Sequence, residues 1–482
     1  MTLNKNVLAI LSALLFLAAA CGESIAPIQS LSEDERPAKA VTAEVGLVVE
    51  EVEVVVVTEE APPAAITTDQ AAVTAVNPQA ESRIRPAAPS LGGGPKGVAD
   101  AVSAEVRATK RAAQAAAAAE SRAKLAKNGR PLLDDEPAYS YEPIWQTDFS
   151  LHTVPYDEIF SGGVPRDGIP PLDNPQFVSV AEADAWLEAV EPVFVVTLNE
   201  ETRAYPLQIL TWHEIVNDTV GGRPVVVTFC PLCNSAVTFE RTVNGMVYDF
   251  GVSGKLRHSD LIMWDRQTES WWQQLTGEAI VGELVGEQLT FIPTRLVSWG
   301  DFKETFPQAE VLSQETGHHR PYGQNPYAGY DSDPAPFLFA GEPDSRLAAM
   351  DRVVAVNLGG EFVAYPYQVL AEQNVIADTV GGQAVVVFWT AGTTSALDGA
   401  AIAGSRDVGS AAVYSPLVDG QALTFAWDGN SFVDAQTDSQ WSIFGQATAG
   451  PLAGSQLEPV IHANHFWFAY AAFHAVRLYG GE

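Results

Sequence analysis

The sequence predicts an α+β fold, mainly β, made of two related (duplicated) β-rich halves after a long disordered tether. Tyr205-Pro206 reappears as Tyr365-Pro366, and the Asp-Thr-Val-Gly-Gly run at 218–222 reappears at 378–382. Both matches have one offset, because 365 − 205 and 378 − 218 are both 160. Such a repeat predicts one structural unit used twice. Short apolar runs bounded by turn residues dominate both copies, which favours strands over helices.

The N-terminus resembles a bacterial export signal. Lys5 precedes an apolar run from Val7 to Ala20, and Cys21 follows directly. The run is too short to span a bilayer core of about 30 Å but suits the core of a signal peptide. Because the ending before Cys21 resembles a lipobox, we expect a lipoprotein signal peptide at 1–20 and lipidation of Cys21. The protein would then be exported and membrane-anchored on the periplasmic or cell-surface side; a plain secretory signal is the alternative.

A low-complexity segment follows the leader. Its first part mixes glutamates with Val, Ala and Pro, and Gly92-Gly93-Gly94-Pro95 interrupts it. The alanine-rich stretch from Ala101 to Ala126 predicts a lone helix without a wide apolar stripe. We therefore predict an acidic and alanine-rich tether at 21–137 that holds a globular body away from a membrane. Contact of its basic helix with anionic lipid is the alternative.

The charge of the chain excludes one class of partner. Its 482 residues include 60 acidic and 27 basic side chains, a formal net charge of −33. So acidic a surface repels phosphate backbones, and we expect no nucleic-acid partner. Solubility is the ordinary explanation of such a charge, and the sequence indicates no particular protein partner.

The first repeat, at 138–340, begins with a regular order of elements. Val193 to Leu198 predicts a buried strand, with a short partner strand ending at Tyr205. Pro206 suits the first position of a helix whose apolar face runs to Val216. The Gly-Gly turn then leads into a strand from Val225 to Phe229.

The remainder of the first repeat also predicts strands and one further helix. Asn244-Gly245 is a strong hairpin signal, and Ser298 is a plausible helix N-cap with Asp301 at the third helical position. The predicted strands of this part are Ala236 to Arg241, Met246 to Phe250, Leu261 to Trp264 and Ser270 to Gln274.

The second repeat, at 341–482, follows the same order but is degenerate. Val353 to Val356 and Val385 to Trp389 predict its strands, and His465 to His474 predicts its terminal helix. At the offset of 160, Cys230 falls on Thr390 and Cys233 on Thr393. A duplication keeps the scaffold in both copies but needs a chemical site only once, so the cysteines are the best candidates for chemistry.

Several long motifs of the body resemble one prokaryotic family. They include Trp212 to Gly222, Thr228 to Ala236, Asp265 to Trp272 and Asn325 to Tyr330. The family is the domain of unknown function 3179 (DUF3179), and the resemblance covers essentially everything after about residue 150. It implies no activity, because the family is functionally uncharacterised.

The Cys-Pro-Leu-Cys motif at 230–233 permits three interpretations. Thiol–disulfide chemistry is one, but not in a thioredoxin fold, because the residues after Cys233 predict a strand rather than a helix. Metal binding is the second: a second Cys-x-x-Cys is missing, yet two thiolates and a histidine suit copper(I) or zinc. A static disulfide or two inert thiols is the third. We expect the two sulfurs to be close together, accessible at the end of a strand and functional as a pair.

Two further groups of residues are candidates. His213 lies on the helix before the dithiol and falls on Gln373 in the second copy, so it disappears together with the cysteines. It is a candidate ligand, or a base that lowers a thiol pKa, while a capped, partly exposed histidine is the alternative. The second group mixes charges and tryptophans as in a ligand cleft, with core packing as the alternative. Its members are Asp260, Asp265, Arg266, Glu269, Trp271 and Trp272.

Two functions of different classes therefore follow from the sequence. One is an enzyme or metallochaperone that uses Cys230 and Cys233 for redox chemistry or for copper or zinc. The other is a non-catalytic ligand-binding or surface scaffold module in which the cysteines only brace a loop. The chain has no P-loop, no Gly-x-Gly-x-x-Gly and no Gly-x-Ser-x-Gly, so nucleotide and serine-hydrolase functions lack support.

Overall fold

The computed structural model describes residues 131–137, 144–339 and 341–481. The predicted signal peptide at 1–20, Cys21 and nearly all of the predicted tether lie outside these residues. Within the described part the fold is mainly β, as the sequence predicts. None of the described helices is long and apolar enough to span a membrane.

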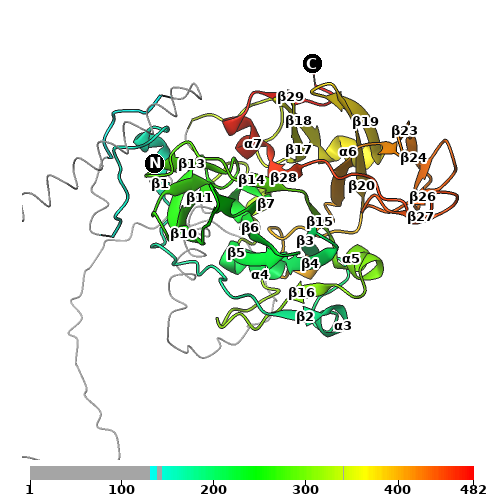
Figure 1. Cartoon of the computed structure of the whole chain (residues 1–482), viewed down its shortest axis with the longest axis horizontal. Helices are drawn as coiled ribbons and strands as arrows, with labels where there is room; N and C mark the ends of the chain where they lie inside the picture. Colours follow the sequence, from blue (N-terminus) through cyan, green and yellow to red (C-terminus); the bar gives the residue numbers. More distant parts are fainter. Residues whose placement is uncertain (1–130, 138–143, 340, 482) are drawn as a thin grey trace, which may run out of the picture. The chain divides into compact units, whose positions relative to one another are not determined.

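One of the two largest sheets has eight strands and combines both parts of the chain. The strands β7 and β28 pair at its middle, where the chain segments before and after residue 340 meet (Figure 1). In order, its strands are β29 (Val476–Leu478), β18 (Glu361–Pro366), β17 (Arg352–Leu358), β28 (His462–Phe466), β7 (Ser235–Glu240), β6 (Arg223–Cys230) and β5 (Ile215–Val220), with β14 (Thr290–Ile292) also on β7.

The other eight-stranded sheet is assembled in the same way. Here β21 and β15 pair where the two chain segments meet. In order, its strands are β19 (Val375–Val380), β20 (Gln383–Thr390), β21 (Ser410–Tyr414), β15 (Thr294–Ser298), β3 (Pro192–Leu198), β4 (Glu201–Pro206), β16 (Glu310–Leu312) and β2 (Phe177–Ser179).

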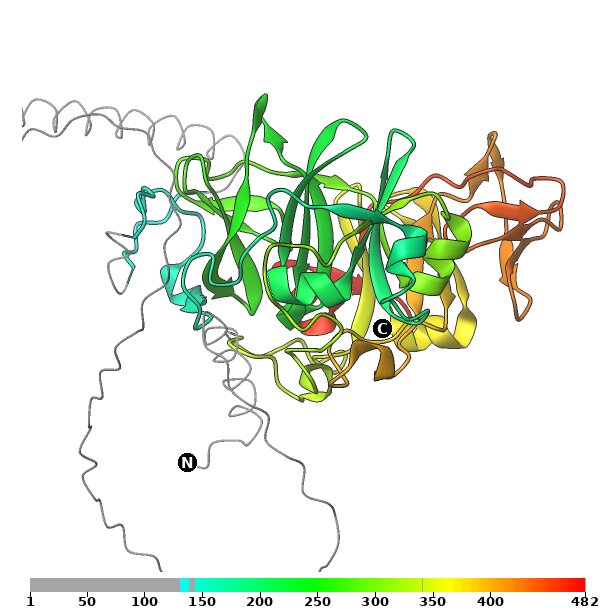
Figure 2. The same cartoon turned by 90° about the horizontal axis from the view of Figure 1, so that it is seen from below.

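Two smaller antiparallel sheets lie at opposite ends of the long sheets (Figure 2). The five-stranded one contains β1 (Ile159–Ser161), β10 (Phe250–Arg257), β11 (Asp260–Asp265), β12 (Trp271–Gln273) and β13 (Glu278–Val281). The four-stranded one contains β24 (Phe425–Trp427), β25 (Phe432–Asp434), β26 (Gln440–Trp441) and β27 (Ala447–Ala449). Two hairpins complete the strands: β8 (Thr242–Val243) with β9 (Met246–Val247), and β22 (Leu417–Val418) with β23 (Gln421–Ala422).

The helices are short. Ser298 caps α5 as predicted, because its hydroxyl accepts a hydrogen bond from the Asp301 backbone N–H. The α-helices are α3 (Val180–Ala183), α4 (Leu207–His213), α5 (Trp299–Thr305), α6 (Tyr367–Gln373) and α7 (Trp467–Phe473). The 3₁₀ helices are η1 (Tyr156–Glu158), η2 (Pro231–Cys233), η3 (Tyr330–Ser332) and η4 (Ile402–Gly404).

The helix predicted to run to Val216 ends earlier. Glu214 has φ 59°, in the left-handed region, and this conformation stops α4 at His213. The chain then extends into β5, a strand that the sequence analysis did not predict, and Phe229 N–H donates to the Glu214 carbonyl at 2.8 Å. The apolar residues after position 213 therefore belong to a sheet and not to a helix face.

Two segments 160 residues apart have the same elements and the same pairing register. In β3–β4, Val193 pairs with Pro206, and in β17–β18, Val353 pairs with Pro366. The Gly-Gly turns occupy matching places, between β5 and β6 and between β19 and β20. A Cβ on Gly221 would lie 2.2 Å from the Leu198 carbonyl oxygen, so this turn position requires glycine.

Candidate functional site

The two cysteines lie at the end of a buried strand. The residues of β6 are buried from Val225 onward. The strand ends at Cys230, which pairs with Ser235 of β7. Pro231 then begins η2, a single 3₁₀ turn that ends at Cys233. The placement at a strand end is as predicted, but the predicted accessibility is wrong. Cys230 is 2% exposed and Cys233 is fully buried, because the turn packs into the main hydrophobic core.

Asp260 reaches the cysteines from another sheet. His258 and Ser259 both have positive φ, and this tight turn brings the chain into β11 at Asp260. The two Sγ atoms and a carboxylate oxygen of Asp260 all lie within 4.8 Å of one another. Among the described residues, this is the one cluster of three or more such groups close enough to bind one metal ion.

The carboxyl group of Asp260 is fully buried and only half satisfied. Its Oδ2 accepts hydrogen bonds from Gln273 Nε2 at 2.6 Å and from Leu275 N at 2.9 Å. Its Oδ1 has no N–H or O–H donor within the part of the chain that the structure describes, and the thiols of Cys230 and Cys233 are further hydrogen-bond neighbours of the carboxyl group. Burial raises the pKa of Asp260 to about 7, although the hydrogen bonds oppose the shift.

Both thiols are also held in their protonated form. Burial raises the pKa of Cys230 and raises that of Cys233 still further, and the neighbouring Asp260 adds to both shifts. A thiol of this kind is a poor nucleophile at neutral pH. A bound cation would instead favour the deprotonated thiols, because it stabilises the thiolates and the carboxylate together.

Glu214 is a fourth acidic group of this site, and the sequence analysis named only its neighbour His213 as a candidate. It is 6% exposed, and its Oε1 accepts a hydrogen bond from Tyr327 Oη at 3.2 Å. Burial raises the pKa of Glu214 to about 8, and repulsion from Asp260 adds to this. Its sequence signal was the same as that of His213: it is replaced, by Asn374, in the copy that lacks cysteines.

A loop segment covers the site. We call residues 324–333 the strap. Tyr327 binds Glu214, and Tyr330 Oη donates to the Leu232 carbonyl oxygen at 3.0 Å, between the two cysteines. At its start, the Gln324 carbonyl oxygen accepts a hydrogen bond from Trp212 Nε1 at 3.2 Å. The strap therefore contacts the elements that carry the acidic groups.

Comparison with known proteins identifies the region that contains this site. A family model described as "Protein of unknown function (DUF3179)" matches residues 166–476. The chain belongs to this family. No curated protein and no solved structure matches it. The DUF3179 region includes β6, η2, β11 and the strap, and thus every element that forms the site.

His213 lies in the DUF3179 region but is not a member of the cluster. Its Nδ1 is 2.7 Å from the Pro170 carbonyl oxygen, and its Nε2 is 2.7 Å from Tyr322 Oη. Burial lowers the pKa of His213 to about 4, so the ring is neutral. Both ring nitrogens thus have partners other than the sulfurs, and the predicted partly exposed position is wrong because the side chain is fully buried.

The predicted ligand-cleft residues separate into two groups. Asp260 begins β11 and joins the cysteines, whereas Asp265 ends the same strand, roughly 16 Å away along it. Asp265 accepts hydrogen bonds from Trp272 Nε1 at 2.9 Å and from the Thr268 backbone N–H at 2.6 Å. In the second half, Asp434 binds Trp441 and Thr437 in the same way. The Asp265 turn is thus a feature that both halves share.

The remaining cleft candidates have partners within the protein. Arg266 pairs with Asp173 at 2.6 Å, and Glu269 pairs with Arg166 at 3.1 Å. Trp271 and Trp272 are fully buried. A cavity of about 230 Å³ lies beside Asp173. Arg266 does not line this cavity but pairs with Asp173, which does. The cavity is lined by Pro171, Leu172, Asp173, Asn174, Pro175, Gln176, Leu312, Ser313, Thr316 and His318.

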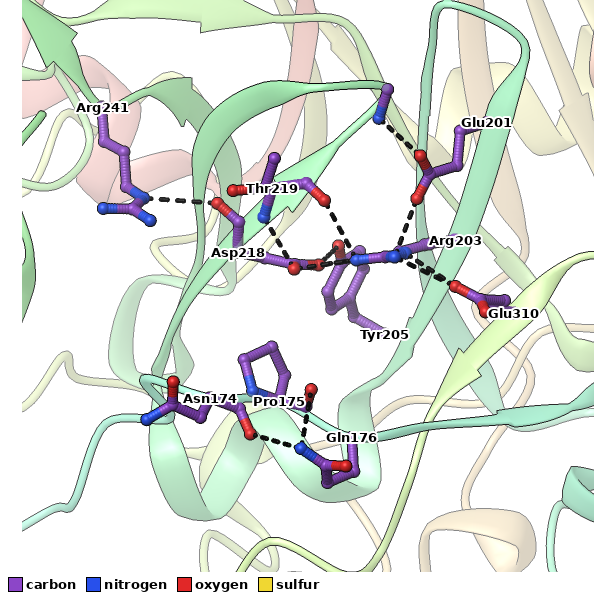
Figure 3. Close-up of polar contacts among 11 residues, drawn as sticks. Asn174, Pro175, Gln176, Glu201, Arg203, Tyr205, Asp218, Thr219, Arg241 and Glu310 are labelled. Carbon is purple, nitrogen blue, oxygen red and sulfur yellow. Dashed lines mark hydrogen bonds and ion pairs between the residues drawn. The ribbon is translucent and has the colours of Figure 1, made fainter.

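A second polar network of the DUF3179 region occurs in both halves. Asp218 accepts hydrogen bonds from Tyr205 Oη at 2.6 Å and from Arg203 Nη1 at 2.8 Å (Figure 3). Asp378 likewise accepts from Tyr365 Oη at 2.8 Å. Its arginine comes from a different strand, because Arg477 of β29 pairs with it at 3.0 Å.

The acidic groups around the cysteines have no such counterparts. Cys230 and Cys233 correspond to Thr390 and Thr393, and Glu214 corresponds to Asn374. Asp434 follows Asp265 by 169, and the same offset places Gly429 at the position of Asp260. The second half therefore contains a Tyr–Asp–Arg network but lacks all four acidic groups of the site.

Proposed function

We propose that Cys230, Cys233 and Asp260 bind a divalent metal ion of the zinc class. The observation that carries this proposal is the convergence of two sulfurs and one carboxylate oxygen within 4.8 Å at a fully buried position. Thiolate and carboxylate are both zinc ligands, with metal–ligand distances of about 2.0–2.3 Å. A small contraction of the cluster around an ion would satisfy these distances.

The ligand types favour zinc over copper(I). Copper(I) prefers soft sulfur ligands, whereas zinc and related borderline ions accept sulfur and oxygen together. Asp260 supplies a hard oxygen, Oδ1, to which no N–H or O–H group of the described residues donates. An ion at this position would also offset the burial of the carboxylate, which otherwise costs several kcal/mol.

The test is a titration of the full-length protein with Co²⁺, a spectroscopic substitute for Zn²⁺. After metal removal under reducing conditions, we expect one equivalent of Co²⁺ to bind with intense S→Co²⁺ charge-transfer absorption. Cys230→Ser, Cys233→Ser and Asp260→Asn should each weaken binding at least about 100-fold, since each removes a ligand. Failure of the wild-type protein to bind Co²⁺ or Zn²⁺ would overturn the proposal.

Two controls accompany this titration. Thr393→Ser changes the position in the second half that corresponds to Cys233 and should leave metal binding unchanged. His213→Gln tests the histidine that the sequence suggested as a ligand. Because both its ring nitrogens bind Pro170 and Tyr322, we expect a loss of stability on the order of 1–3 kcal/mol without a change in Co²⁺ affinity.

Thiol–disulfide chemistry is the second candidate, and one observation favours it. Asp260 can accept the proton of a neighbouring buried thiol, since its pKa is raised by burial to about 7. Oxidation would join the two sulfurs and release two electrons and two protons to a disulfide substrate, which would become two thiols. Burial of both sulfurs argues against a protein substrate. Thiol counting distinguishes the candidates: a metal site protects both thiols, whereas a redox site loses them to a disulfide reversibly.

The proposal extends to the location of the protein. The Leu-Ala-Ala-Ala-Cys ending at 17–21 supports export and acylation of Cys21. Cys21→Ala should then move the protein from the membrane fraction to the soluble fraction. Unchanged membrane association would contradict the anchor while leaving the metal proposal untouched.

We further propose that the two halves arose by duplication and that only the first retained the site. Equal element order, equal pairing register and the shared offset of 160 support this. Superposition of residues 193–230 on 353–390 in an experimental structure should align them residue by residue. A shift of either Gly-Gly turn relative to the other would contradict it.

A further inference from the structure

We propose that Glu214 is the fourth ligand of this metal site, which makes it a closed four-coordinate centre with two sulfurs and two oxygens. The inference rests on the proposed function and deepens it, because it names the residue that determines which metals the site selects. Four independent features of Glu214 carry it: its backbone conformation, its position beside the dithiol, its buried carboxyl group, and the residue at its counterpart position.

The backbone of Glu214 is in a conformation that glutamate rarely adopts. Its φ is 59°, and a non-glycine residue in this region costs on the order of 1 kcal/mol. Asn374, at the corresponding position, also has φ 59°. Asparagine tolerates this region better than glutamate does. The half that retains the cysteines thus carries the less favourable residue at the same backbone geometry.

The position of Glu214 is fixed next to the dithiol strand. Its N–H donates to the Leu210 carbonyl at 2.8 Å, and its own carbonyl accepts from Phe229 N–H at 2.8 Å. Since Phe229 directly precedes Cys230, the Glu214 backbone lies opposite the last residues of β6. Its carboxylate is not among the ligand atoms that already lie within 4.8 Å of one another, so the Glu214 side chain would turn toward the ion when the ion binds.

The carboxyl group of Glu214 has little other reason to be buried. Among the described residues it makes no salt bridge, and it accepts a hydrogen bond from Tyr327 Oη at 3.2 Å. Both Asp260 and Cys230 lie close enough to interact with it electrostatically, and both interactions are repulsive for the charged forms. Without a cation, this arrangement destabilises the folded protein.

The counterpart in the second half shows that folding does not need a carboxylate here. Asn374 Nδ2 donates to the Trp389 carbonyl oxygen at 3.3 Å and so satisfies the turn locally. An asparagine at 214 would serve the fold at lower cost. Retention of glutamate beside the cysteines therefore indicates a chemical role.

The fourth ligand decides the metal class. Two thiolates and two carboxylates around a divalent ion carry the same formal charge as a Cys₄ zinc site. Around copper(I), the same ligands would leave one more negative charge in a buried position. The second carboxylate thus selects divalent borderline ions and excludes an open coordination position for water.

Glu214→Asn is the matched variant, because Asn374 shows that asparagine adopts this conformation. In the full-length protein loaded with Co²⁺ alone, we expect Zn²⁺ competition to reveal an affinity at least about 10-fold lower than that of the wild type. We also expect azide to shift the Co²⁺ spectrum of the variant but not that of the wild type, since only the variant has a vacant position. Its relative preference for copper(I) should rise about 10-fold.

Glu214→Gln keeps the side-chain length and removes the charge, and it should behave like Glu214→Asn. Asn374→Gln is the control in the second half and should change none of these properties. Equal affinity, spectrum and azide response in wild type and Glu214→Asn would overturn the inference while the Cys₂Asp site stands. A wild-type spectrum that responds to azide would also overturn it. A wild-type protein that binds no metal would instead remove the proposed function itself.

Discussion

At the scale of single residues, the first half of the body contains acidic groups that do not stabilise the fold by themselves. Asp260 and Glu214 are buried, and among the described residues neither makes a salt bridge. At neutral pH the raised pKa values leave Glu214 mostly and Asp260 partly protonated in the folded protein, whereas an unfolded chain would release both protons. The stability of the metal-free protein should therefore depend on pH through these two groups.

The first prediction concerns that dependence. For Glu214 the folded pKa is about 8 and the ordinary value is 4.5, so the folded state binds more protons between these limits. Its contribution to stability is present at low pH and is lost as the pH rises from about 5 to 8. Relative to metal-free wild type, Glu214→Asn should gain on the order of 2–4 kcal/mol between pH 5 and pH 8.

Urea unfolding of both metal-free proteins at several pH values measures this difference. His213 and His462 have pKa values lowered to about 4 by burial, so they favour the folded state as the pH rises toward 6.5. Both proteins contain them, and their effect cancels in the comparison. A difference that stays constant from pH 5 to pH 8 would show that Glu214 is already ionised in the folded protein.

At the scale of elements, the strap connects the site to the second half of the body. Its Asn325 and Gly329 backbone N–H groups donate to the Ala400 and Asp398 carbonyl oxygens at 2.9 and 2.6 Å. Asp331, whose side chain is fully buried, pairs with Arg352 at 2.9 Å and with Arg406 at 3.0 Å. The loop of the second half that lacks cysteines therefore holds the strap over the cysteines of the first.

Arg352→Met should loosen the strap. It leaves the buried Asp331 carboxylate with the half-exposed Arg406 as its one remaining charged partner, beside the Ser395 hydroxyl, and we expect a loss on the order of 3 kcal/mol. The reaction of Cys230 and Cys233 with a thiol reagent should accelerate at least about 10-fold in the metal-free protein. Arg346→Met is the control, because the side chains of the Arg346–Asp344 pair are 41% and 30% exposed, and a pair accessible to water contributes about 0–1 kcal/mol. Equal thiol reactivity in the two variants would show that the strap does not limit access.

The sequence predicted the strand that carries Cys230 and the Ser298 cap because both depend on local patterns. It missed Asp260 and Glu214 as partners of the cysteines for a physical reason. Asp260 lies 30 residues beyond Cys230 and reaches it only through the β10–β11 turn, whose positive-φ residues His258 and Ser259 give no sequence signal. The prediction that the two thiols are accessible was wrong because the strap, about 95 residues further along the chain, covers them.

At the scale of the whole molecule, each long sheet contains strands from both halves. The first half alone would retain β5, β6, β7 and β14 of one sheet and β15, β3, β4, β16 and β2 of the other. Both remnants would expose an edge that β28 or β21 normally covers. The boundary near residue 340 thus divides the sequence into two repeats, but both long sheets contain strands from either side of it.

A chain ending at residue 340 should therefore fail to fold by itself. We expect it to aggregate or to give a poorly dispersed NMR spectrum, and co-expression with residues 341–482 should restore a soluble complex. Cooperative unfolding of the isolated 138–340 fragment, with native-like Co²⁺ binding, would instead establish two independent domains. Circular dichroism and heteronuclear NMR of the fragment and of the co-expressed pair measure the outcome.

Asp218 and Asp378 each pair with an arginine, but the arginine lies on β4 in the first half and on β29 in the second. The strand that carries the arginine is therefore interchangeable. Arg203 of β4 lies opposite Glu310 of β16, and Val363 of β18 lies opposite Arg477 of β29. The arginine can thus occupy either of two neighbouring strands.

Arg203→Val alone should lower the free energy of unfolding by about 2–4 kcal/mol. Adding Glu310→Arg should recover much of this loss, measured by urea unfolding. A double variant no more stable than Arg203→Val would mean the carboxylate cannot be served from the neighbouring strand. Such a rescue would show that the arrangement of the second half also works in the first, and that an arginine can change strands while the protein stays folded.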